Sequence, residues 1–159
     1  MNKIISSRVL GYPQVIWAII KNIPTLDPLV IIFNSKMLCF LSKEGKVISF
    51  VAIKKYPKFY ELGTVYTFPS WRNKGYASLL IRYAIKLYRP IGLLCKRKMV
   101  SYYKKFGFKE SAKCGAMINL RRKLFNFFLR PFLGYSIISM IHTRRPHTKS
   151  FIEISKKKS

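Results

Sequence analysis

The segment with the clearest chemical signature runs from Thr67 to Ser78 and reads Thr-Phe-Pro-Ser-Trp-Arg-Asn-Lys-Gly-Tyr-Ala-Ser. It lies between an apolar, β-prone run and the start of an amphipathic helix. The first N–H groups of a helix lack partners within the helix, and the helix dipole adds partial positive charge there. Gly75 has no side chain to keep a pyrophosphate away, and Arg72 and Lys74 add charge. The segment therefore predicts a phosphate site, with a basic surface loop as the alternative.

Strands and helices are expected on both sides of this segment. Residues 37–42 and 47–53 are β-prone runs joined by the hairpin signal at 43–46, and a third strand follows at 60–68. Pro69 ends that strand because it has no N–H to donate. A helix is predicted over residues 76–88, with one apolar stripe consisting of Ala77, Leu80, Ile81, Ala84, Ile85 and Tyr88.

The chain continues with alternating elements. Pro90 ends the helix, residues 91–95 predict a short buried strand, and a second helix carries an apolar stripe at Met99, Tyr102, Tyr103 and Phe106. A final strand pair is expected near residues 108–111 and 116–120. A short helix is also expected within residues 14–22. The order β-β-β-α-β-α-β predicts a mixed α+β or α/β sheet with helices packed on it.

Two motifs resemble the GCN5-related N-acetyltransferase (GNAT) family. The turn at Arg72 is similar to the family's Arg/Gln-x-x-Gly-x-Gly/Ala turn, and Ser-Tyr-Tyr-Lys-Lys-Phe-Gly-Phe at 101–108 is similar to its helix ending in Tyr-x-x-x-Gly-Phe. The likeness covers residues 37–120. It implies the GNAT-like acyl-CoA N-acyltransferase fold, with acetyl-CoA as co-substrate. It also implies acetyl transfer to a primary amine by direct attack in a ternary complex.

The resemblance assigns roles to individual residues. Tyr103 takes the position of the acid that protonates the departing thiolate, and Arg72 flanks the pyrophosphate cradle. Lys96 stands where many members carry an asparagine that touches the cofactor; it could instead pair with a cofactor phosphate, or signal a degenerate site. The backbone of Val65, Tyr66 and Thr67 is expected to bind the pantetheine arm. The pyrophosphate is expected to contact the N–H groups of Asn73, Lys74, Gly75, Tyr76, Ala77 and Ser78.

Glu61 is the candidate base that would deprotonate the amine. It precedes Arg72 by eleven residues, a spacing that resembles the histone-acetylating branch of the family, in which a strand glutamate deprotonates lysine. The alternative is an ion-pair partner for the cations of this basic chain.

Charge limits the chemistry and indicates the partners. The 159 residues include 31 Lys and Arg against 5 Asp and Glu, a net charge of +26. So few scattered acids argue against a two-metal carboxylate site or a glycosidase pair. The field attracts nucleic acid and other polyanions, anionic lipid and coenzyme A. A non-catalytic nucleic-acid-binding protein on the same fold is therefore an alternative to the enzyme.

The cysteines and histidines have no metal-ligand spacing, so neither zinc nor disulfides are expected. Cys39, Cys95 and Cys114 are interpreted as buried apolar residues in a reducing compartment, with the cytoplasm as the default location. The apolar start of the chain is interrupted by Arg8 and Pro13, and we do not interpret it as a secretory signal.

Residues 1–120 are expected to form the acetyltransferase domain and 121–159 a basic, aromatic-rich extension. The apolar part of this extension is interpreted as a helix covering the sheet, with a membrane surface as the less favoured contact. Pro131 and Gly134 are expected to break the regular helix that an interfacial segment needs.

Overall fold

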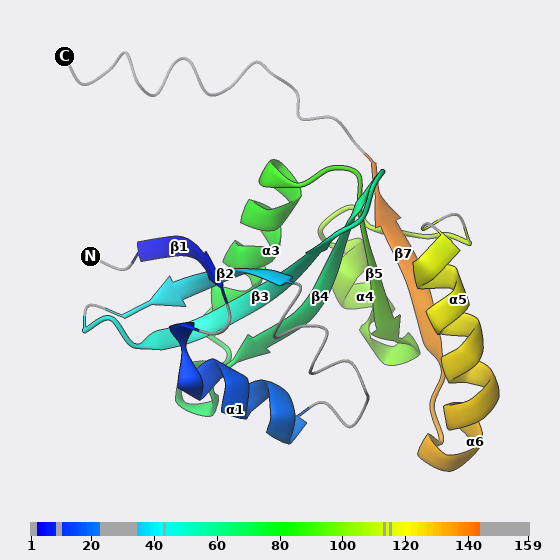
Figure 1. The fold of residues 1–159 in the computed structure, drawn as a ribbon, viewed down its shortest axis with the longest axis horizontal. Coiled ribbons are helices and arrows are strands. Elements are labelled where there is room, and N and C mark those ends of the chain that lie inside the picture. Colours follow the sequence, from blue (N-terminus) through cyan, green and yellow to red (C-terminus); the bar gives the residue numbers. More distant parts are fainter. Residues whose placement is uncertain are drawn as a thin grey trace.

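The computed structural model of the chain describes residues 3–8, 11–22, 35–42, 44–112, 114 and 116–143. Its seven strands form one sheet in the order β1-β2-β3-β4-β5-β7-β6 (Figure 1). Neighbouring strands are antiparallel except for β4 and β5, which are parallel, so the sheet is mixed as predicted. The strands are β1 (Lys3–Arg8), β2 (Ser35–Leu41), β3 (Val47–Lys55), β4 (Tyr60–Thr67), β5 (Ile91–Lys96), β6 (Lys109–Glu110) and β7 (Ile137–His142).

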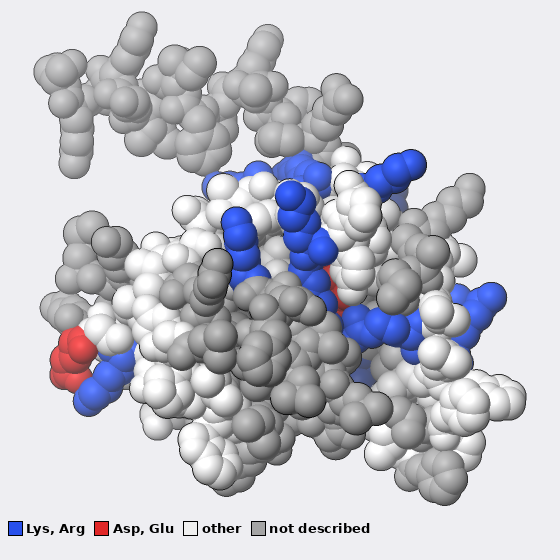
Figure 2. All heavy atoms as spheres, viewed as in Figure 1, with Lys and Arg blue, Asp and Glu red and all other residues white. Residues whose placement is uncertain are grey.

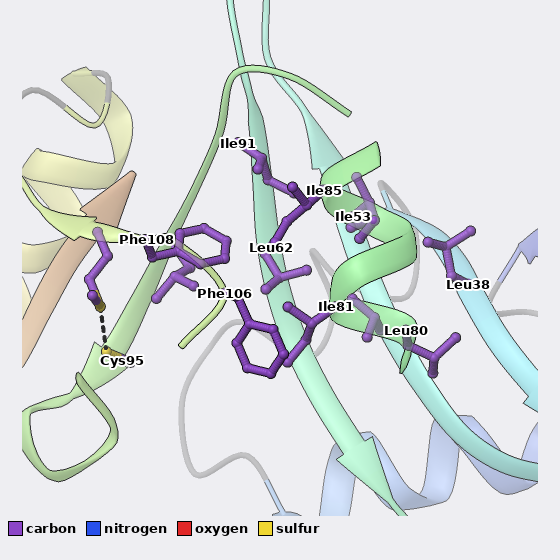
Figure 3. Close-up of a cluster of buried hydrophobic side chains, with 14 of the residues drawn as sticks. Leu38, Ile53, Leu62, Leu80, Ile81, Ile85, Ile91, Cys95, Phe106 and Phe108 are labelled. Atoms are coloured by element: carbon purple, nitrogen blue, oxygen red, sulfur yellow. Dashed lines mark hydrogen bonds between the residues drawn. The ribbon is translucent and has the colours of Figure 1, made fainter. Parts of the chain in front are cut away.

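Helices cover both faces of the sheet. The predicted helix is confirmed as α3 (Tyr76–Leu87), which buries Leu80, Ile81, Ala84 and Ile85. These side chains pack with Ile53 and Leu62 of the strands in the larger core cluster (Figure 3). The short N-terminal helix is confirmed as α1 (Pro13–Asn22), and its Val15 packs with Phe50 and Ala52. Because successive strand residues alternate between faces, α1 and α3 lie on opposite sides.

The predicted hairpin between β2 and β3 is confirmed. The Ser42 N–H donates to the carbonyl of Lys46 at 2.9 Å, and the backbone N–H groups of Glu44 and Lys46 each donate to Ser42 Oγ at 3.2 Å. Gly45 takes a φ of 76°, in the left-handed region that favours glycine. Lys43 lies outside the described residues. Strand β1, which pairs along β2, was not predicted.

The strand expected at residues 116–120 is wrong. Residues Ala116–Leu124 form a helix, α5, followed by the π-helical turn η4 (Phe125–Leu129) and by α6 (Arg130–Leu133). A short apolar run does not distinguish a buried strand from a helix, and Ala, Met, Leu and Arg are good helix formers. Ile118 of α5 packs over β5 at Gly92, where an added Cβ would lie 3.4 Å from the Ile118 side chain.

The last strand of the sheet comes from the segment beyond residue 120. Strand β7 lies between β5 and β6 and pairs with β5 along its whole length. Asn126 fixes its start, since its side-chain amide donates to the Ile137 carbonyl at 3.0 Å and accepts from the Ile137 N–H at 2.9 Å. The sheet thus continues into the predicted extension, of which residues 144–159 lie outside the described residues.

Candidate functional site

The two parallel strands at the centre of the sheet diverge. Strands β4 and β5 pair over three residues each, from Tyr60 with Ile91 to Leu62 with Leu93. Beyond this point β4 stays paired with β3 as far as Thr67, and β5 stays paired with β7 as far as Lys96. Figure 1 shows the strands separating toward their C-terminal ends. Because backbone groups alternate along a strand, every second residue of β4 here directs its N–H and C=O toward β5.

A β-bulge in β4 accompanies the divergence. The register with β3 passes from Ile53 opposite Leu62 to Val51 opposite Val65, so Gly63 and Thr64 together face one residue, Ala52. An extra residue bends its strand and increases the local twist. Glycine suits this position, since a Cβ on residue 63 would lie 3.3 Å from the Ala52 carbonyl oxygen.

The predicted anion turn joins the end of β4 to α3. After a single 3-10 turn at Pro69–Trp71, Asn73 and Gly75 take φ values of 61° and 80°. Gly75 is the N-cap of α3, and no side chain caps this helix. A Cβ added to Gly75 would meet no heavy atom within 4 Å. The turn therefore presents an uncapped helix N-terminus that is open on the side of Gly75, where unpaired N–H groups favour a phosphate group.

Two exposed cations border this turn. Arg72 Nε donates to the Thr67 carbonyl at 3.2 Å, which holds the side chain against the end of β4. The Lys74 ammonium lies 5.0 Å from the centre of the Trp71 ring. These partners carry no negative charge that would compete with an anion bound at the turn.

Tyr103 lies on the short helix α4 (Val100–Lys104), which follows a 3-10 turn at Arg97–Met99. Its half-buried ring packs edge-on against Tyr102 and Phe108, with centroids 5.3 and 6.0 Å apart. Burial raises the pKa of the Tyr103 phenol, and the nearby Cys95 thiol on β5 raises it further. The hydroxyl carries its proton at neutral pH, and burial extends this protonated range to higher pH.

Tyr102 makes a contact that sequence reasoning missed. Its phenolic oxygen lies 3.3 Å from Ser78 Oγ, and this contact joins α4 to the first turn of α3. Tyr102 and Tyr103 are neighbours on one predicted apolar stripe, so helical periodicity does not reveal which of the two hydroxyls faces α3.

Glu61 lies among partners rather than in an open cleft. It is 3% exposed, and Arg121 Nη1 lies 2.8 and 2.9 Å from its two carboxylate oxygens. The Tyr56 hydroxyl donates to the same carboxylate at 2.8 Å. Glu61 stands opposite Gly92 in the paired part of β4 and β5, before the strands diverge. Sequence reasoning missed Arg121 as a partner because it expected a strand to end at residue 120, whereas helix α5 continues through residue 121.

Lys96 is placed at the C-terminal end of β5, where the strands have diverged. Its ammonium lies 4.0 Å from the centre of the Tyr135 ring, and the side chain is exposed. The structure therefore gives Lys96 an aromatic partner in the loop before β7, which sequence reasoning did not identify.

Cys39, Cys95 and Cys114 are buried, as predicted, and each is a free thiol in this structure. Burial raises the pKa of Cys95, the thiol that also affects the pKa of Tyr103, to about 11. The thiolate is the reactive form of cysteine, so Cys95 is a poor nucleophile at neutral pH. Within the described ranges, no three His, Cys, Asp or Glu side chains gather where they could hold a metal ion.

The ion pair between Glu61 and Arg121 predicts a large effect on stability. We expect Glu61→Gln and Arg121→Met each to lower the free energy of unfolding by roughly 2–4 kcal/mol, because each removes one charge of a largely buried ion pair. The double variant should lose less than the sum of the two single losses. Urea unfolding followed by circular dichroism measures these values.

The control is an exposed ion pair of the same kind. Lys104 and Glu110 lie 3.0 Å apart with both side chains about half exposed. Glu110→Gln should cost less than about 1 kcal/mol. Equal losses for Glu61→Gln and Glu110→Gln would contradict a stabilising role of the buried pair.

Comparison with known proteins places this site in a family. Residues 14–108, more than half of the chain, match the Acetyltransferase (GNAT) family. No curated protein sequence matches the chain. Among solved structures, a GNAT acetyltransferase from Elizabethkingia anophelis with acetyl-CoA bound has a TM-score of 0.64 at 15% identity, covering 88% of this chain and 94% of that one.

Two further structures share the fold. GCN5 of Tetrahymena has a TM-score of 0.60 at 13% identity, with 90% of this chain and 98% of that chain covered. ElaA of Escherichia coli has a TM-score of 0.61 at 12% identity, with coverage of 89% and 99%. These likenesses extend over nearly the whole of each neighbour, and they confirm the fold that the two motifs implied. The diverging strands and the uncapped turn thus belong to a member of the GNAT family of acetyltransferases.

Proposed function

We propose that this protein transfers an acetyl group from acetyl-CoA to a primary amine by direct attack in a ternary complex. The observation that carries the proposal is the divergence of β4 and β5 beside the uncapped turn before α3. A thioester arm can enter between the strands only where they are unpaired, and a pyrophosphate needs the free N–H groups at the end of the same strand. Both conditions are met within one segment, residues 63–78.

The residues at the end of β4 and in the turn before α3 suit the binding of acetyl-CoA. The pyrophosphate would accept hydrogen bonds from backbone N–H groups at residues 73–78, with Arg72 and Lys74 adding charge. The pantetheine arm would pair with the free edge of β4 at residues 65–67, as an added strand pairs with a sheet edge. The E. anophelis protein, which shares the fold, holds acetyl-CoA in its structure.

Acetyl-CoA supplies an acetyl group activated as a thioester. During transfer, the amine nitrogen forms the new C–N bond and loses a proton. The C–S bond breaks and leaves a thiolate, which must gain a proton. We assign the proton that the thiolate needs to Tyr103, whose hydroxyl is protonated at neutral pH and whose ring lies near Cys95 on the diverging strand. With Cys95 kept as a thiol, direct attack is favoured over a covalent cysteine intermediate.

The contacts of Glu61 favour a structural role over proton transfer. Both carboxylate oxygens of Glu61 already accept from Arg121, and one of them also accepts from the Tyr56 hydroxyl, so neither is open to an incoming amine. Its assignment as the base stays a prediction. Acetyl transfer by Glu61→Gln tests it, provided that the variant is still folded.

For the acceptor, we propose an amine carried on an anionic molecule. All three glutamates in the described ranges already pair with cations, namely Glu44 with Lys46, Glu61 with Arg121 and Glu110 with Lys104. Figure 2 shows Lys and Arg side chains on several parts of the viewed face. A simple polyamine would therefore approach against the field of the protein, whereas an anionic carrier is drawn to it.

The turn is tested by Gly75→Glu, which places bulk and negative charge where the pyrophosphate would bind. We expect acetyl-CoA binding to weaken by at least about a hundredfold, because the added carboxylate repels the phosphates at close range. Isothermal titration with acetyl-CoA measures the effect.

Gly45→Glu is a matched control for this substitution. Gly45 has a φ of 76° against 80° for Gly75, and a Cβ at either position meets no heavy atom within 4 Å. The control variant should bind acetyl-CoA as the unaltered protein does. If both variants bind equally well, the pyrophosphate site lies elsewhere.

The acid is tested by Tyr103→Phe, with Tyr102→Phe as the control that removes the neighbouring hydroxyl. We expect kcat to fall by roughly 100-fold or more for Tyr103→Phe, with little change in acetyl-CoA affinity, since the hydroxyl acts on the leaving sulfur. Because its pKa is raised, Tyr103 itself should cause no loss of rate as pH rises from 7 to 9.

The rate can be followed as thiol release with a peptide that carries one lysine among aspartates as the acceptor. Tyr102→Phe should keep most of the activity. Unchanged turnover by Tyr103→Phe would remove this residue from the mechanism.

A further inference from the structure

The helical segment from Ala116 to Leu133 has one face against the protein and one face away from it. The inner face carries Ile118, which is fully buried, Arg121 on Glu61, and Asn126 on the backbone of Ile137. In Figure 1, α5 and α6 lie along the outer side of β7, at the edge of the molecule.

The opposite side of this segment, which we call the outer face, consists of Leu120, Leu124, Phe127 and Phe128. These side chains are 50%, 47%, 74% and 58% exposed. They follow one another at helical spacing on the side away from Ile118. Four large apolar side chains in one exposed row form a patch of the kind that marks an interaction surface.

The expectation that Pro131 breaks this helix is wrong, whereas Gly134 does end it, as expected. Helical turns continue through Pro131 to Leu133, and the Gly134 N–H donates to the Arg130 carbonyl at 3.0 Å where the helix ends. The π-helical turn just before Arg130 is wider than an α-helical turn and takes in one more residue. This widening accompanies the proline and leaves both Phe127 and Phe128 directed outward.

The charge beside the outer face is of one sign. The exposed side chains of Lys123 and Arg130 lie within the same turns of the helix. Residues 111–143 contain no Asp or Glu. An apolar row with cations in its own helical turns is complementary to a surface that has an apolar interior and a negatively charged outer layer.

We propose that the outer face binds the surface of an anionic lipid bilayer. The four apolar side chains would enter the boundary between headgroups and acyl chains, and Lys123 and Arg130 would contact the lipid phosphates. None of the helices in the described ranges is long and apolar enough to cross a bilayer, so the helix would lie along the surface. This inference is independent of the acetyltransferase activity.

The geometry favours lipid over nucleic acid at this face. Phe127 and Phe128 pack edge-on against each other, with centroids 4.9 Å apart at 86°, so they do not form a flat platform on which successive bases could stack. Leu120 and Leu124 offer no ring for stacking. Burial in acyl chains, by contrast, stabilises leucine and phenylalanine alike.

The test is sedimentation of the full chain with vesicles, at a salt concentration that weakens purely electrostatic attraction. Vesicles of phosphatidylcholine with one third phosphatidylglycerol are compared with vesicles of phosphatidylcholine alone. We expect binding to the anionic vesicles only. The double variant Phe127→Ser with Phe128→Ser should bind them at least about tenfold more weakly, although it keeps every cation.

Two controls show whether the effect is specific to the outer face: one removes exposed apolar side chains elsewhere, and the other measures stability. The double variant Trp17→Ser with Leu87→Ser removes two side chains that are 71% and 52% exposed on α1 and α3, and it should bind as the unaltered protein does. Circular dichroism should show that both double variants melt near the temperature of the unaltered protein. If the Phe127 and Phe128 variant is unstable, Leu124→Gln takes its place.

Three outcomes would overturn the proposal. In the first, the unaltered protein fails to bind anionic vesicles, and in the second, the two double variants bind them equally well. In the third outcome, the Phe127 and Phe128 variant loses binding to a single-stranded oligonucleotide but keeps its binding to vesicles. The third outcome would assign the outer face to nucleic acid.

Discussion

The short parallel contact between β4 and β5 is the constraint on which the site depends. Three residues of each strand hold the two halves of the sheet together, and β3 and β7 then hold the strands apart. The bulge at Gly63 and Thr64 bends β4 at this point. Polar backbone groups left unpaired inside a sheet are costly unless a ligand or water pairs with them. The divergence therefore forms a binding slot from main-chain atoms, and many different side chains are compatible with such a slot.

Side chains around the slot provide its positive charge and its proton donor. The buried phenol of Tyr103 is protonated at neutral pH, and Arg72 and Lys74 contact a carbonyl and an aromatic ring rather than acids. The glutamates of the described ranges are all engaged with cations. The site thus offers positive charge and a proton donor, but it offers an amine no free carboxylate from those ranges.

Much of the fold, and the turn before α3, could be predicted from local sequence patterns. The apolar stripe of α3 and the hairpin at Gly45 depend on residues close in sequence, and both predictions were confirmed. The two motifs that indicated the family are also local, and the family assignment was confirmed. The bulge at Gly63, the pair between Glu61 and Arg121, and the place of β7 depend on contacts between distant segments. The misassigned strand at residues 116–120 shows the limit, because a short apolar run acquires its structure from what it packs against.

The most direct measurement is the thermal unfolding of nucleic-acid-free protein with acetyl-CoA at elevated salt, compared with a nucleotide of equal charge. A ligand at about a hundred times its dissociation constant stabilises the folded state by roughly 2.7 kcal/mol, which for a domain of this size raises the melting temperature by several degrees. The account predicts such a rise with acetyl-CoA and a much smaller one with the nucleotide. No rise, or the same rise with both anions, would contradict a dedicated acetyl-CoA site at the diverging strands.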